Sequence, residues 1–63
     1  MVFKDVDKVL RKNNWYVVRI KGSHHQYRHH DFGYCVTVPN HGKSDLSLGV
    51  LKNVEKGTGL SLR

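Results

Sequence analysis

Two adjacent histidines, His24 and His25, follow a Gly22-Ser23 pair at the start of an extended, strand-like segment. Histidine is the side chain whose unperturbed pKa lies nearest to neutral pH, so it can both accept and donate a proton. The surrounding chain is basic, with a formal net charge of +6 and five histidines in all. Such a chain attracts polyanions. The combination predicts proton-transfer chemistry on a nucleic acid, or recognition of one, with RNA as the expected partner.

The composition excludes several classes of protein. With 63 residues, 38% of them hydrophobic, the chain is expected to form one domain, residues 1–63, with a single thin layer of core. An active site is then expected on an open face rather than in a deep cleft. The single cysteine, Cys35, excludes an intramolecular disulfide and a cysteine-rich zinc site. Neither a signal-peptide pattern nor a membrane-spanning apolar run is present, so we expect a cytoplasmic protein with no membrane partner.

The hydrophobic pattern predicts a helix, three strands and a second helix, joined by short turns. In an amphipathic helix apolar residues recur every three to four positions and form one stripe, whereas aromatic and β-branched residues favour strands. The expected elements are a helix at residues 3–14, strands at 15–21, 24–30 and 34–38, and a helix at 47–56. Gly57 is expected to end the last helix. Short connections between consecutive strands predict an antiparallel meander.

The alternation of side chains along a strand predicts which residues face the helices and which face solvent. Toward the helices we expect Tyr16, Val18, Ile20, His25, Tyr27, His29, Val36 and Val38. On the open face we expect Val17, Arg19, Lys21, His24, Gln26, Arg28, Cys35 and Thr37. This parity favours His24 over His25 as the reactive histidine, provided that the second strand has no β-bulge.

Metal binding is the competing use of the paired histidines, namely His24, His25, His29 and His30. Residues four apart on a strand are separated by roughly 13 Å, whereas two ligands of one zinc each lie ~2 Å from the metal. Neighbouring histidines on a strand also point to opposite faces. We therefore expect no metal site and no cofactor.

Other chemically capable residues have simpler interpretations. Trp15 is expected to anchor the core rather than to stack on a base, and Cys35 to be a small filler. His41 lies in a polar loop at residues 40–44, where it is either a spectator or a second proton-transfer group.

The motifs Gly22-Ser23-His24 and Val36-Thr37-Val38-Pro39, followed by a helix with Gly49, Leu51 and Lys52, closely resemble the HicA toxins of bacterial and archaeal toxin–antitoxin modules. The resemblance covers nearly the whole chain. It implies an α+β fold like the double-stranded-RNA-binding domain, with the order α-β-β-β-α, a three-stranded antiparallel sheet and helices on one face. It also implies metal-independent mRNA cleavage, with His24 as the catalytic residue, and a HicB-type antitoxin that covers the active site. The chain departs from many relatives after Pro39, where Asn40 stands in place of a histidine, so the role of the loop stays open.

A metal-free mechanism consistent with these residues uses the 2′-OH of RNA as nucleophile and His24 as general base or acid. The products would be a 2′,3′-cyclic phosphate and a 5′-OH end. The residues expected to contact RNA are Arg19, Lys21, Ser23, Gln26, Arg28 and Lys43. The alternative functions are a non-catalytic RNA-binding module and a protein that docks an acidic partner on the same face.

Overall fold

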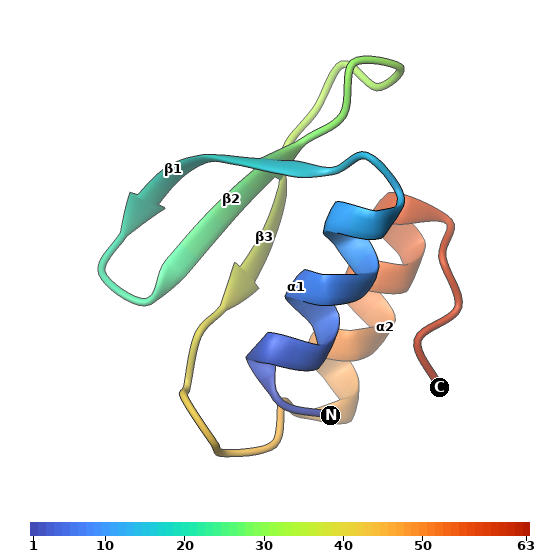
Figure 1. Ribbon diagram of the computed structural model, residues 1–63. Coiled ribbons are helices and arrows are strands. Elements are labelled where there is room, and N and C mark those ends of the chain that lie inside the picture. The colour runs from blue at the N-terminus through green and yellow to red at the C-terminus, as the bar shows by residue number, and fades with distance from the viewer.

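The computed structural model describes residues 1–63 and has the element order that the sequence predicts. The elements are α1 (Phe3–Lys12), β1 (Tyr16–Lys21), β2 (His24–Arg28), β3 (Val36–Pro39) and α2 (Leu48–Thr58) (Figure 1). The strands form one antiparallel sheet in the order β1-β2-β3. The second and third strands are shorter than expected, because residues 29–35 form a loop that extends beyond the sheet (Figure 1).

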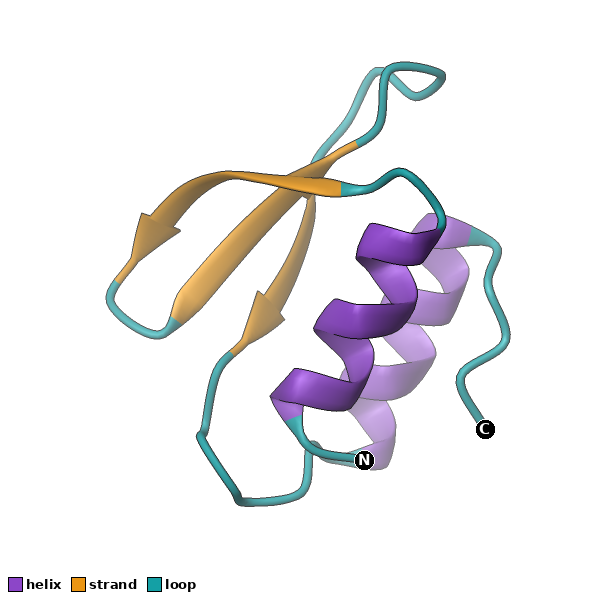
Figure 2. Ribbon diagram, in the orientation of Figure 1, coloured by secondary structure: helices purple, strands orange, loops and turns teal.

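Both helices lie on one face of the sheet, and the other face is uncovered (Figure 2). The α-β-β-β-α order with this layering is the α+β fold of the double-stranded-RNA-binding-domain type, as expected. Between the layers lies one cluster of ten buried apolar residues: Val6, Leu10, Trp15, Tyr27, Val36, Val38, Leu46, Leu51, Val54 and Leu62. Trp15 is only 2% exposed, which confirms that it anchors the core. Neither helix has the length and apolar composition required to cross a membrane.

Two alternate residues of β2 attach this strand to α1. The ring of His25 lies 4.5 Å from the ring of Phe3, measured between centroids. Tyr27 is fully buried, and its hydroxyl donates a hydrogen bond of 2.5 Å to Oδ1 of Asp7, which also accepts from Arg11. Burial, and then this bond to a carboxylate, raise the pKa of Tyr27 far above its ordinary value. Because His25 and Tyr27 point toward the helix, their neighbours on β2 point to the other side of the sheet. These neighbours are His24, Gln26 and Arg28.

A β-bulge in β1 reverses the side-chain alternation expected at the start of that strand. The pairing register with β2 shifts between Val17 and Arg19, which leaves Val18 as the extra residue. Val17 therefore packs against the core and Tyr16 faces solvent, the reverse of the expectation. Beyond the bulge, Ile20 shares the helix side with His25, but it is 59% exposed because the β1–β2 hairpin extends past the helices (Figure 1). Arg19 keeps its expected outward direction because its cross-strand partner is Gln26.

The end of α2 also differs from the expectation. The helix continues through Gly57, and its C-cap is Gly59, which has the left-handed φ of +75° that favours glycine. Gly57 serves packing instead: a Cβ atom at this position would lie 2.9 Å from Cγ2 of Val36 on β3. The apolar spacing of Leu48, Leu51 and Val54 predicts that all three face inward, but Leu48 is exposed at the first turn of the helix.

Gly57→Ala is expected to destabilise the protein by about 1 kcal/mol, although alanine is the better helix former. Overpacking a core costs ~1–3 kcal/mol, against a gain of about 1 kcal/mol in helix propensity. Urea unfolding followed by circular dichroism measures the difference. In a Val36→Ala background, where the contacting methyl groups are gone, the same substitution should cost clearly less. A stabilised Gly57→Ala protein would contradict the close approach of α2 to β3.

Candidate active site on the open face of the sheet

His24 is the first residue of β2 and lies directly after the hairpin turn. Gly22 in that turn has a φ of +58°, a left-handed conformation that suits glycine and reverses the chain over a short distance. His24 is paired with Lys21 on β1 and with Pro39 on β3, so it lies in the central strand at one end of the sheet. Its side chain is exposed, as expected from the parity of β2.

The register of the three strands defines the residues that share a face with His24, because directly opposite residues project to the same side. Arg19, Gln26 and Thr37 form the next row across the sheet, and Tyr16 and Arg28 form the row after that. We define the open face as Tyr16, Arg19, Lys21, His24, Gln26, Arg28 and Thr37. The structure thus brings Arg19, Lys21, His24, Gln26 and Arg28 together on one surface, as the sequence predicts.

The positive charges of the open face have no acidic partner within the chain. The five carboxylates are all used elsewhere: Asp5 accepts from the backbone N–H of Val2, and the other four pair with the N-terminus, Arg11, Arg63 or the histidines at 29 and 30. Arg19, Lys21 and Arg28 are exposed and form no ion pair. A patch of uncompensated cations of this kind attracts a polyanion.

The loop at residues 40–44 begins beside the hairpin turn that precedes His24. The backbone N–H of Asn40 donates to the carbonyl oxygen of Ser23 at 2.6 Å, and the side chain of Asn40 accepts from the N–H of Gly42 at 2.9 Å. Ser23 and the start of this loop are thereby held at the same end of the sheet as His24. His41 and Lys43 are exposed on the loop.

The other histidines lie in different surroundings. His25 is half-buried against α1, and its Nδ1 lies 3.4 Å from the carbonyl oxygen of Ser23. His29 is 8% exposed and packs against both Trp15 and Phe32, whose rings stack on each other. The four histidines considered as metal ligands from the sequence are therefore not brought together as a set. The expectation that adjacent histidines point to opposite faces is wrong for His29 and His30: β2 ends at Arg28, and their rings stack with centroids 4.9 Å apart.

A different set of metal-capable groups does gather after β2. His29, His30 and Asp31 each offer a ligand atom, and these atoms lie within 4.8 Å of one another. Nδ1 of His29 already accepts a hydrogen bond of 3.1 Å from the backbone N–H of Asp31. A metal at that atom would have to displace this hydrogen bond.

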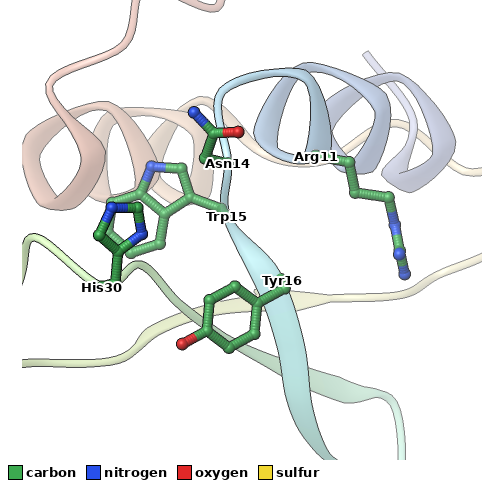
Figure 3. Close-up of a pocket in the computed structure, with 5 residues that line it drawn as sticks. All are labelled: Arg11, Asn14, Trp15, Tyr16 and His30. Atoms are coloured by element: carbon green, nitrogen blue, oxygen red, sulfur yellow. The ribbon is translucent and has the colours of Figure 1, made fainter.

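A pocket of about 440 Å³ lies at the junction of α1 and β1, and the sequence pattern does not predict it. Its lining consists of Arg11, Asn14, Trp15, Tyr16 and His30 (Figure 3). The pocket depends on the bulge at Val18, which turns the ring of Tyr16 out of the core. No simple pattern in the sequence shows such a bulge, because Tyr16, Val18 and Ile20 alternate as in a regular strand.

The comparisons with known proteins agree with this architecture. A family model described as the HicA toxin of bacterial toxin–antitoxin systems matches residues 3–60. A search of curated proteins gave no significant match. Because the family model covers nearly the whole folded chain, from the start of α1 to beyond the cap of α2, the protein belongs to the HicA family of toxins of bacterial toxin–antitoxin systems.

Proposed function

We propose that the protein is a metal-independent endoribonuclease that cleaves mRNA, with His24 as its single catalytic histidine. The observation that supports this most strongly is the position of His24: an exposed imidazole in the central strand, on a face whose cations lack acidic partners. RNA carries its own nucleophile in the ribose 2′-OH, so proton transfer and charge stabilisation suffice to break its backbone.

In the proposed reaction, the imidazole of His24 accepts the proton of the 2′-OH as the 2′-oxygen attacks the adjacent phosphorus. The bond between phosphorus and the 5′-oxygen then breaks, and the 5′-oxygen leaves with a proton. The products are a 2′,3′-cyclic phosphate and a 5′-OH end. A single histidine can supply either transfer, with water serving the other. His41, on the loop that starts beside the hairpin turn, is the candidate for a second proton-transfer group.

The cations of the open face would stabilise the negative charge that develops on the pentacoordinate phosphorus. Lys21 is directly opposite His24 across the β1–β2 pair and is the closest of them in register. Arg19 and Arg28 lie one and two rows further along, where they would hold the RNA backbone, and Gln26 lies directly opposite Arg19 in β2. Ser23 and Lys43 would extend this contact surface at the hairpin end.

The proposed partners are mRNA and a HicB-type antitoxin, both acting in the cytoplasm. An antitoxin that neutralises this activity would cover His24 and offer carboxylates to the uncompensated cations of the open face. The same charges would then serve substrate and inhibitor in turn, which makes the two ligands mutually exclusive.

Cleavage of RNA in the presence of excess EDTA tests this proposal. We expect the purified protein to cleave a mixed-sequence RNA at the same rate with and without the chelator, because His24 and the cations supply all the chemistry. Mass spectrometry of the fragments should show a 2′,3′-cyclic phosphate. Loss of activity in EDTA, restored by a divalent ion, would contradict the mechanism. Binding without cleavage under all conditions would favour the non-catalytic RNA-binding module instead.

A further inference from the structure

The pocket at the α1–β1 junction is the second chemically distinctive feature of the surface, and its lining is unusual for a solvent-facing site. It combines the ring of Tyr16, 46% exposed, with the side-chain amide of Asn14 and the small exposed part of Trp15 (Figure 3). The pocket is a depression of about 440 Å³ that is largely open to solvent, so a bound group would lie against its wall rather than be enclosed. Aromatic rings with a few hydrogen-bonding groups are the usual lining of a site for a flat heterocycle.

The backbone at Asn14 indicates that this junction is constrained. Asn14 is the one non-glycine residue with a positive φ, at +70°. Asparagine tolerates this left-handed conformation better than most residues. It also carries both a hydrogen-bond donor and an acceptor on one side chain, which can pair with an acceptor and a donor on the edge of a base.

The one permanently charged residue of the lining is paired within the chain. Arg11 is paired with Asp7 at 2.9 Å, and Nε2 of His30 lies 3.4 Å from Oδ1 of Asp31. The pocket therefore suits a neutral group better than a phosphate. Directly beside it on the open face, Arg28 is opposite Tyr16 and has no acidic partner. A neutral pocket next to a free guanidinium matches a nucleotide, whose base is neutral and whose phosphate is charged.

The pocket is also continuous with the proposed catalytic surface. Tyr16 and His24 lie at opposite ends of the β1–β2 pair, and Arg28 marks the end of β2 at which the pocket lies. Arg28 is four residues after His24 along the strand, a distance of roughly 13 Å. A single RNA strand bound along β2 would therefore run from His24, past Gln26 and Arg28, to the pocket.

From these observations we propose that the α1–β1 pocket binds one base of the RNA substrate, stacked on Tyr16, at a position outside the cleaved dinucleotide. The proposal rests on the ribonuclease function proposed above, and it adds a specificity-determining subsite to it. Tyr16 is a substrate-positioning residue in this account, because it contacts the bound RNA but not the reacting atoms.

Replacing single nucleotides by abasic ones tests the subsite. Cleavage sites of the wild-type protein are first mapped on a defined RNA, and the bases around one site are then removed one at a time. We expect one position, beyond the two nucleotides that flank the scissile bond, at which loss of the base lowers kcat/KM by roughly tenfold to a hundredfold, the range for one base–aromatic stack. The loss should appear mainly in KM.

Two variants of Tyr16 assign this effect to the pocket. Tyr16→Ala should lower kcat/KM on the intact RNA by a similar factor and should be insensitive to the abasic substitution, whereas Tyr16→Phe should behave like the wild type. Tyr34→Ala is the control, because Tyr34 is similarly exposed and lies outside the pocket. It also removes the hydrogen bond that the Tyr34 hydroxyl donates to the carbonyl oxygen of Gly57. Thermal melts of all three variants check that the fold is retained.

The outcomes separate this inference from the proposed function. If His24→Ala abolishes cleavage but folded Tyr16→Ala cleaves intact and abasic RNA like the wild type, the subsite is wrong and the ribonuclease stands. If Tyr16→Ala retains full cleavage but no longer binds the antitoxin, the pocket belongs to protein recognition and the inference is overturned. If His24→Ala remains active, the function itself is wrong.

Discussion

Replacing the 2′-OH of the nucleotide on the 5′ side of a mapped cleavage site by hydrogen is expected to abolish cleavage at that site. The 2′-oxygen is the nucleophile of the proposed reaction, and nothing else on the open face replaces it. The chain supplies an imidazole and cations, which move protons and stabilise charge but form no bond to phosphorus. Cleavage of the singly deoxy-substituted RNA, followed by gel electrophoresis, measures the effect.

A matched RNA with the deoxy substitution one nucleotide further along serves as the control. It should be cleaved at nearly the rate of the unmodified RNA, because only one 2′-OH is adjacent to the phosphorus under attack. Cleavage of both substituted RNAs at the normal site would mean that water, and not ribose, attacks phosphorus. In that case the products would carry a linear phosphate instead of a 2′,3′-cyclic one.

His24→Ala is expected to lower the rate of RNA cleavage by about 10²–10⁴-fold, the usual contribution of general acid–base catalysis. The residue is exposed, so the substitution should leave the fold intact. RNA affinity, measured by fluorescence anisotropy with a labelled oligonucleotide, should change little, because the unpaired cations remain. Expression of the variant should no longer inhibit bacterial growth.

Lys21→Ala distinguishes loss of chemistry from loss of binding. Because Lys21 lies opposite His24 and carries one of the free charges, its removal should weaken both RNA binding and cleavage. His24→Ala should separate these two properties. A His24→Ala protein that loses RNA affinity as well as activity would indicate that His24 mainly binds the substrate.

The sequence was sufficient to predict the order of the helices and strands and the face of the sheet on which His24 lies. Both depend on strong local signals: the apolar stripe of α1, the strand-forming residues of β1 and β3, and a single large amphipathic residue in β2. Tyr27 had to face the core, and parity then placed His24 on the opposite side. On the helix side, the hydroxyl of Tyr27 donates a hydrogen bond to Asp7, so the burial of Tyr27 leaves no polar atom of this side chain unsatisfied.

The parts that could not be predicted depend on contacts between segments distant in the chain. The bulge at Val18 exchanges the faces of Tyr16 and Val17, although the alternation of the sequence favours the opposite arrangement. Gly57 looks like a helix end, yet its role follows from the approach of Val36 on another strand. The α1–β1 pocket is lined by Tyr16 and therefore depends on the bulge that turns this ring outward. A sequence that does not predict the bulge cannot predict the pocket.

The most direct test of catalysis by His24 compares the His24→Ala and His25→Ala proteins. Their cleavage rates are measured in EDTA, under single-turnover conditions, on one RNA. The two histidines are neighbours on β2, but one faces solvent among cations and the other packs on Phe3 of α1. We predict that His24→Ala is slower than the wild type by at least a hundredfold, while folded His25→Ala retains most of the activity. Equal activity in His24→Ala and the wild type, or loss confined to His25→Ala, would contradict the assignment of catalysis to the open face.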